Sequence, residues 1–290
     1  MDKELSILNN MIYIEYLAGG RTGFIVKMDK LVYSKQTNLQ RIDVFDTTDL
    51  GRVIALDGKI VYAEESGYMY SEMLTHVPLF THPNPQRVGV IGGGTGAVLH
   101  EILKHPEVRE VSVCEEDPYL IYATKKYFKP FEKDFLDPRT TVVNKKGTTF
   151  MSMISRGFDV IIIDAPSPII SQSGYLFTQN FYKSCKEKLN DGGILSVEIE
   201  DPFYGKGWLA ITYKRLSMLF PKTQIYTGHI TPNPVGFLTY AIASKEYDPV
   251  EDSDKEKIKK FNSDFKYYND RIHSAAFCLP NFLKDLIKKL

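Results

Sequence analysis

The sequence has few cysteines and no excess of charge of either sign. Its three cysteines, Cys114, Cys185 and Cys278, are widely spaced and follow neither a metal-ligand spacing nor a disulfide framework. We therefore expect reduced, buried thiols and no metal site. Lysines plus arginines number 36, as do aspartates plus glutamates, so the formal net charge is zero. This balance gives no electrostatic basis for binding nucleic acid or an anionic membrane.

Long apolar runs and targeting signals are also lacking. No segment approaches the roughly 20 apolar residues that a transmembrane helix needs. The N-terminal stretch MDKELSILNNMIYIEYL lacks the basic and apolar regions of a signal peptide. Apolar residues make up 43% of the chain and charged residues 25%, which is typical of a soluble globular protein. We expect a cytoplasmic protein without membrane contact.

The first third of the chain has the pattern of an antiparallel sheet. Val, Ile, Tyr and Phe are frequent in residues 23–36, 39–47 and 52–65, and Asp57-Gly58 is a turn signal within the last of these. We predict a small N-terminal β domain over residues 1–66. The next residues, up to Pro83, have apolar side chains near one face of a predicted helix.

From Arg87 onward, predicted strands alternate with predicted helices. The strands are residues 87–92, 110–117, 140–147, 158–166, 193–200 and 236–244; the helices are 97–105, 118–128, 148–155 and 178–189. Such alternation indicates an α/β domain, here residues 67–290, with a mostly parallel sheet and helices on both faces. The charge run at 250–261 is typical of a solvated helix face.

A glycine loop lies between the first strand and the first helix of this pattern. Gly92, Gly94 and Gly96 in VIGGGTG allow a tight turn and a close approach of the backbone to a ligand. Glu115, about 20 residues on, ends the next predicted strand, where a carboxylate can accept hydrogen bonds from both ribose hydroxyls. The context favours nucleotide binding over the alternative, a tight turn without a ligand.

Longer motifs resemble the spermidine synthase family of polyamine aminopropyltransferases. VIALDGKIVYAEE resembles the family's strand pair around an LDG turn, and YSEMLTHVPLFTHPNPQRVGVIGGGTG resembles its YxEMxxHxPLxxHPxPxxVLIIGGGDGG stretch. CEED is similar to its CEID, YLFTQNFYKSCKEKL to its LFxxxFYxxxxxxL helix, and YYNDRIHSAAFCLPNF to its C-terminal motif. These matches cover most of the chain.

The resemblance implies a fold, a reaction and an assembly. The fold is an N-terminal β domain followed by a Rossmann-like, doubly wound sheet of the S-adenosylmethionine-dependent transferase type. The reaction moves an aminopropyl group from decarboxylated S-adenosylmethionine, a co-substrate rather than a tightly bound cofactor, to a small-molecule amine. The expected assembly is a homodimer or a homotetramer.

The resemblance also implies three sets of site residues. The expected catalytic residues are Asp164, Tyr70 and Ser167. The expected residues around the adenosyl co-substrate are Gln40, Gly92, Gly94, Thr95, Gly96, Glu115 and Lys146. The expected residues around the amine are Tyr70, Glu72, Asp164 and Asn233.

Five of the matched positions depart from the family pattern. The family has aspartate where this chain has Thr95, Lys146 and Ser167, tyrosine at Asn233 and histidine at Ser71. Replacing three ionised aspartates by Thr, Lys and Ser changes the formal charge of the site by about +4. A hydroxyl can hydrogen-bond an ammonium group but cannot neutralise it. We therefore expect a pocket that attracts cations less strongly, with altered or reduced activity.

Several readings stay open at this point. Asp164 could cap a helical turn, and Tyr70 could be a buried aromatic between domains. Glu198, Glu200 and Asp201 could supply relocated negative charge or form a solvent-facing acidic loop, and we expect the loop. Three functions compete: an aminopropyltransferase, a diverged transferase for another adenosyl ligand, and a non-catalytic paralogue.

Overall fold

The N-terminal region contains two antiparallel sheets. A computed structural model describes residues 11–17, 20–166, 172–233 and 235–290. A two-stranded ribbon pairs β1 with β2, and a four-stranded meander has the order β3-β4-β5-β6. Their bounds are β1 Ile12–Tyr16, β2 Gly23–Lys27, β3 Lys30–Gln36, β4 Arg41–Thr47, β5 Gly51–Leu56 and β6 Lys59–Ala63. The antiparallel sheet predicted from residues 23–65 is confirmed, although β1 was not predicted.

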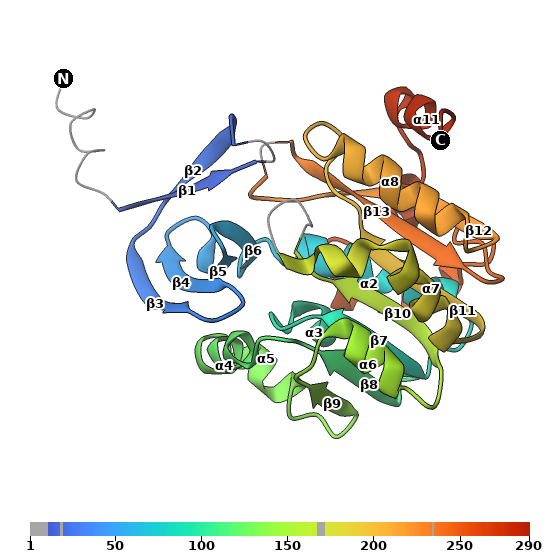
Figure 1. Cartoon of the computed structure of the whole chain (residues 1–290), viewed down its shortest axis with the longest axis horizontal. Helices are drawn as coiled ribbons and strands as arrows, with labels where there is room; N and C mark the ends of the chain where they lie inside the picture. Colours follow the sequence, from blue (N-terminus) through green and yellow to red (C-terminus); the bar gives the residue numbers. More distant parts are fainter. Residues whose placement is uncertain (1–10, 18–19, 167–171, 234) are drawn as a thin grey trace.

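A seven-stranded sheet forms the body of the molecule (Figure 1). Its order is β12-β13-β11-β10-β7-β8-β9; β9, β8, β7, β10 and β11 run parallel, and β13 is antiparallel to both β11 and β12. The bounds are β7 Arg87–Gly92, β8 Glu110–Cys114, β9 Thr140–Val143, β10 Phe158–Asp164, β11 Leu189–Glu198, β12 Lys222–His229 and β13 Phe237–Ser244. The predicted doubly wound, mostly parallel sheet is confirmed: β13 is its antiparallel strand, and the edge strand β12 was not predicted.

Helices cover both faces of this sheet. Successive side chains of a strand point to opposite faces, so Val160 and Ile162 pack in one core, while Ile161 and Ile163 pack in the other. The first core takes side chains from α2 (Tyr68–Thr81), α3 (Ala97–Leu103), α9 (Lys255–Phe261) and α10 (Asp270–Ala276). The second takes them from α6 (Gly147–Met153), α7 (Gln179–Lys188), α8 (Lys206–Ser217) and α11 (Asn281–Ile287). Among these helices, α8, α10 and α11 were absent from the prediction.

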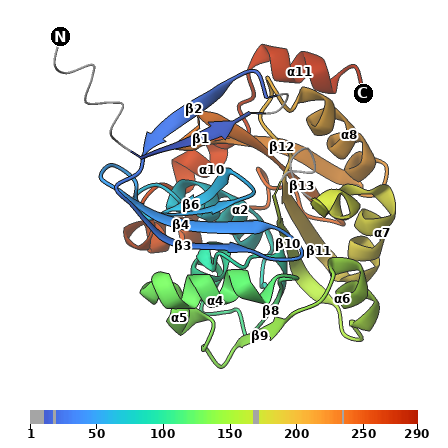
Figure 2. The ribbon, with the colours of Figure 1, turned by 60° about the vertical axis from the view of Figure 1, so that its left-hand side comes forward.

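The meander lies against the large sheet near α4 and α5, as two views show (Figures 1 and 2). The side chains of Ile42, Val44 and Ile54 pack with those of α4 (Pro118–Tyr127) and α5 (Lys129–Asp134) in a shared apolar cluster. Short 3₁₀ turns occupy Gln172–Phe177 and Asn262–Asp264. The division of the chain at residue 66 stays a prediction; β6 ends at Ala63 and α2 begins at Tyr68.

Two expectations about the surface have different outcomes. Ile258 of α9 is buried and most of that helix is exposed, as expected for the charge run. Cys114 and Cys185 are buried free thiols, but Cys278 is exposed, so the expectation of three buried thiols is wrong for Cys278. Among the described helices, none is long and apolar enough to cross a membrane.

Candidate functional site

A cavity of about 230 Å³ opens where the strand order of the large sheet reverses. β7 and β10 are neighbours there, and the connections after them run in opposite directions along the sheet, which is where ligands bind in open α/β folds. The β5–β6 hairpin of the meander closes the cavity from the other side with Asp57 and Lys59. The site therefore combines the carboxyl ends of parallel strands with a wall from the N-terminal sheet.

The glycine loop has a structural requirement that is independent of any ligand. A Cβ atom on Gly92 would lie 2.0 Å from the carbonyl oxygen of Asp164, because β7 and β10 approach closely there. Gly96 has φ +76°, and a Cβ atom there would lie 2.9 Å from Phe131. Gly92 and Gly94 line the cavity together with Thr95, whereas Gly96 is not part of the described lining. The adenosyl assignment thus fits three of these four positions.

Glu115 lies directly after β8 and faces the glycine loop. Its Oε2 accepts a hydrogen bond from the Gly94 amide at 3.1 Å, and its Oε1 accepts one from the Asp117 amide at 2.8 Å. Burial raises the pKa of the Glu115 carboxyl to about 7; the two amide bonds oppose this rise, and the charge of Asp117 adds to it. The predicted location at a strand end above the glycine loop is confirmed.

Gln40 joins the two parts of the site. It lines the cavity, and its Nε2 donates to Asp117 Oδ2 at 3.3 Å; the Thr37 hydroxyl donates to the same oxygen at 2.8 Å. Asp117 also caps α4 by accepting from the Tyr119 amide. These bonds hold the connection between β3 and β4 against the start of α4, the helix that follows Glu115.

Asp164 and Tyr70 meet at the opposite end of the cavity. The Tyr70 hydroxyl donates to Asp164 Oδ1 at 3.1 Å, which joins the start of α2 to the end of β10. Burial raises the pKa of the Asp164 carboxyl to about 6; the Tyr70 hydrogen bond opposes this rise, and the charge of Glu198 adds to it. Asp164 is thus a half-buried carboxylate in the cavity wall with a raised pKa, and the turn that it could cap lies outside the described residues.

The expectation of a solvent-facing acidic loop is wrong. Glu198, Glu200 and Asp201 are only 9%, 7% and 6% exposed, because β13 and α8 enclose the end of β11. Glu198 lines the cavity, and its Oε1 accepts from the Glu200 amide at 2.6 Å. Burial raises the pKa of both glutamates, while Lys59 opposes the rise. The position of Glu198, after a strand next to β10, was the sequence signal for a site residue.

The expectation that the pocket attracts cations less strongly than those of similar proteins stays a prediction. Among the described lining residues, six are carboxylates and three are lysines. The carboxylates are Asp57, Glu115, Glu116, Asp117, Asp164 and Glu198; the lysines are Lys59, Lys145 and Lys146. The charge change of about +4 was counted only at the replaced aspartates. It therefore did not include Asp57, Glu116 and Glu198, which lie at the ends of three different strands. These carboxyl groups include candidates to pair with an ammonium ligand.

Glu116 and Lys146 form a pair at the mouth of the nucleoside end. Lys146 Nζ lies 4.0 Å from Glu116 Oε1, and the Tyr175 hydroxyl donates to Glu116 Oε2 at 2.9 Å. The Lys146 side chain is 64% exposed and that of Glu116 is 26% exposed. Tyr175 therefore participates in the pocket wall as well as preceding α7.

Among the described residues predicted for the site, Glu72 and Asn233, like Gly96, do not line the cavity. The carboxylate of Glu72 accepts hydrogen bonds from the amides of Lys266, Tyr267 and Tyr268 at 2.7–2.9 Å, so it anchors the C-terminal segment. The amide oxygen of Asn233 accepts from Val235 within its own turn. Ser167 lies outside the described residues. The substrate-binding assignment of Glu72 is not supported, because its acceptor oxygens are already occupied.

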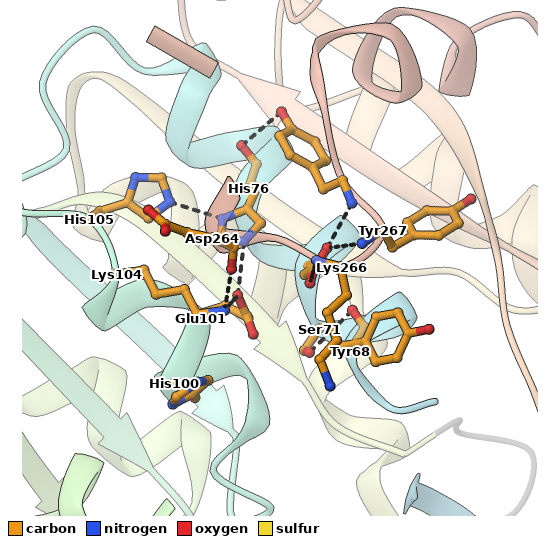
Figure 3. A network of polar contacts seen from close by, with 12 residues as sticks. Tyr68, Ser71, His76, His100, Glu101, Lys104, His105, Asp264, Lys266 and Tyr267 are labelled. Atoms are coloured by element: carbon orange, nitrogen blue, oxygen red, sulfur yellow. Dashed lines mark hydrogen bonds and ion pairs between the residues drawn. The ribbon is translucent and has the colours of Figure 1, made fainter. Parts of the chain in front are cut away.

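A buried polar network lies beside Glu72. His76 of α2 contacts Glu101 Oε2 of α3 at 3.0 Å and His105 at 2.9 Å, and Lys104 forms an ion pair with Glu101 at 2.7 Å (Figure 3). Burial lowers the pKa of His76 to about 4, and the Glu101 carboxylate opposes this shift. The network fastens α2, which carries Tyr70, to the helix after the glycine loop.

Comparison with known proteins matches nearly the whole chain. Residues 67–255 match a family model described as a spermine/spermidine synthase domain, and residues 11–64 match one described as a spermidine synthase tetramerisation domain. The polyamine aminopropyltransferases of Thermotoga neapolitana and Thermotoga maritima are each 45% identical over 284 residues, which cover 98% of this chain and 96% of each relative. That of Bacillus subtilis is 36% identical over 92% of this chain and 95% of the relative.

Solved structures agree with this relationship. The crystal structure of a spermidine synthase in complex with the transition-state analogue AdoDATO is similar with a TM-score of 0.94 and 45% identity, covering 97% of this chain and 96% of the other. The spermidine synthase from Thermotoga maritima has a TM-score of 0.92 and 44% identity with the same coverage.

Proposed function

This chain belongs to the spermine and spermidine synthase family, and we propose that it transfers an aminopropyl group from decarboxylated S-adenosylmethionine to an amine. The observation that carries this proposal is a single cavity with two chemically distinct ends. One end has the glycine loop and Glu115, which suit a nucleoside. The other has Asp164, Tyr70 and Glu198, which suit an ammonium group.

The proposed chemistry needs a proton acceptor at the second end. The amine nitrogen forms a bond to the carbon beside the sulfonium, and the carbon–sulfur bond breaks with its electron pair left on sulfur. The products are the elongated amine, 5′-methylthioadenosine and one proton. We assign the role of proton acceptor to Asp164, whose raised pKa of about 6 suits general base catalysis near neutral pH.

Glu198 and Tyr70 have complementary proposed roles. Glu198 is a buried carboxylate in the cavity wall, so we propose that it binds an ammonium group of the acceptor. Tyr70 donates to Asp164 and orients that carboxylate. Thr95 also lines the cavity, and its hydroxyl can accept a hydrogen bond from the aminopropyl ammonium without neutralising it.

Mass spectrometry of reaction products tests the function directly. We expect purified protein with decarboxylated S-adenosylmethionine to give an amine one aminopropyl group heavier, together with 5′-methylthioadenosine. Putrescine and longer amines, offered separately, identify the acceptor. Consumption of ordinary S-adenosylmethionine alone would favour a diverged transferase, and no product with any pair would favour a non-catalytic paralogue.

We propose a homotetramer whose assembly uses the outer face of the β1–β2 ribbon. Ile12, Ile14 and Tyr16 alternate along β1 and are 46%, 43% and 61% exposed, and Ile25 pairs directly with Ile14 and is 65% exposed. Apolar side chains gathered on one face indicate an interaction surface. Light scattering of Ile14→Asp/Ile25→Asp protein should give a smaller assembly than the wild type, whereas exchange of the exposed Met153 for Asp should not. An unchanged mass for the double variant would contradict this interface.

A further inference from the structure

The order of strands indicates where the base of a bound nucleoside lies. The glycine loop follows β7, and Glu115, the ribose-type carboxylate, follows the neighbouring strand β8. β9 is the next strand outward, so a base attached to that ribose extends toward the residues that follow β8 and β9. Those residues include Glu116 and Lys146, and both line the same cavity as Glu115.

The Glu116 carboxylate is held in a fixed place at this end. Tyr175 donates to Oε2 at 2.9 Å, which leaves Oε1 without a hydrogen bond from the described residues. Oε1 faces the ammonium group of Lys146 at 4.0 Å, and that ammonium lies 6.0 Å from the centre of the Tyr175 ring. Two side chains from separate segments therefore hold one carboxylate with a free acceptor oxygen at the cavity wall.

Glu116 and Lys146 offer a ligand opposite hydrogen-bonding roles. An ammonium group donates only, and an ionised carboxylate accepts only. The aspartate that similar proteins have at position 146 could accept a hydrogen bond from an exocyclic amino group; Lys146 cannot. Glu116 can do so from the end of the neighbouring strand, and Lys146 can donate to the adjacent ring nitrogen.

We propose that Glu116 recognises the 6-amino group of the nucleobase, and that Lys146 and Tyr175 position its carboxylate. The inference rests on the proposed adenosyl co-substrate. It makes Glu116 the residue that distinguishes a 6-aminopurine from a 6-oxopurine, because the oxygen of a 6-oxopurine would face the carboxylate without a proton between them.

Calorimetry with two product-like nucleosides tests the proposal. Wild-type protein should bind 5′-methylthioadenosine at least about tenfold more tightly than 5′-methylthioinosine, as a hydrogen bond to a charged group allows. Glu116→Gln should remove most of this preference, because the amide of glutamine can also donate to a 6-oxo group. Glu132→Gln, an exposed carboxylate on α5 outside the cavity lining, is the matched control and should preserve the preference.

A second variant tests whether a carboxylate at position 146 can replace the one at position 116. Glu116→Ala/Lys146→Asp returns a carboxylate to position 146 and should restore a preference for the 6-amino nucleoside that Glu116→Ala alone has lost. Unfolding curves for each variant ensure that the compared proteins are folded.

The outcomes separate this inference from the proposed function. An unchanged preference in Glu116→Gln, or a wild-type preference for the 6-oxo nucleoside, would overturn the role of Glu116 while aminopropyl transfer stands. Wild-type protein that binds neither nucleoside and forms no aminopropylated amine would overturn both.

Discussion

Replacing Asp164 by asparagine removes the proposed proton acceptor while retaining its size. The Asp164 carboxyl lies in the cavity wall, and no other described carboxylate accepts from Tyr70. We expect kcat to fall by about 10²–10⁴, the usual contribution of a general base. The assay is initial-rate release of 5′-methylthioadenosine with decarboxylated S-adenosylmethionine and the amine identified by mass spectrometry.

The pH dependence tests the same assignment with a defined sign. Because the folded-state pKa of Asp164 is about 6, the base is ionised above that pH and protonated below it. The profile of kcat/KM reports ionisations of free enzyme and free substrate. The free amine already imposes a slope of one on log kcat/KM in the acid range, so we expect the slope to steepen to about two below pH 6.

Substitutions at two neighbours of Asp164 should shift the pH at which this slope changes, the break of the profile, in opposite directions. The Tyr70 hydrogen bond stabilises the ionised form, so Tyr70→Phe should raise the break by about one pH unit or more, since a bond to a charged group contributes about 1.5–3 kcal/mol. The charge of Glu198 destabilises the ionised form, so Glu198→Gln should lower the break. Tyr213→Phe, on α8 outside the cavity lining, is the control.

The reasoning would be refuted by a break that stays in place in both neighbour variants. A loss of less than tenfold in Asp164→Asn would likewise exclude this residue as the base. Effects on KM alone would mean that Asp164 binds the amine and that the proton leaves by another route.

Three further predictions concern other parts of the molecule. Glu115→Ala should abolish measurable calorimetric binding of 5′-methylthioadenosine; unchanged affinity would exclude the ribose assignment. Thr95→Asp should raise the rate with putrescine by supplying a partner for the aminopropyl ammonium, and an equal or lower rate would contradict that role. His76, buried against Glu101 and His105, has a folded-state pKa of about 4, below its ordinary 6.5. The unfolded chain therefore binds this proton more readily, so His76 contributes a loss of up to about 3 kcal/mol as the pH falls from 6.5 to 4. The raised pKa values of Glu115 and Asp164 act in the opposite direction, so the measurement is the difference in the free energy of unfolding in urea between wild type and His76→Asn. A difference that does not change with pH would contradict the assignment.

Local sequence patterns were sufficient for the elements that position the nucleoside end. The apolar run before Gly92 and the helical pattern after Gly96 are properties of adjacent residues, and parallel strands place Glu115 beside the loop. β12 and α8 escaped prediction although each has apolar residues, because their burial depends on partners such as β13 and α7.

Residues whose role depends on distant partners could not be assigned from sequence. Glu72 fits a recurrent Tyr-x-Glu motif, yet its carboxylate is occupied by amides 194 to 196 residues away. Glu198 sits in a strongly acidic stretch that resembles a surface loop, but pairing of β11 with β13 buries it at the cavity. In both cases the decisive contact is tertiary.

The same dependence on partners decides how the aspartate replacements affect the site. A formal charge counted at the matched positions treats each as independent, whereas the charge of Glu198 helps to raise the pKa of Asp164, and Lys59 opposes the raised pKa of Glu198. At the nucleoside end, the lysine at position 146 is accompanied by a carboxylate at position 116, four ångströms away. The exchange of aspartate for lysine at position 146 changes the formal charge by two units and Glu116 offsets one of them, so the local change is about half of what the count at Lys146 alone implies. At Thr95, which lines the same cavity, a threonine replaces a negative charge, so we expect acceptor kinetics, rather than nucleoside affinity, to differ most from those of relatives with aspartate at this position.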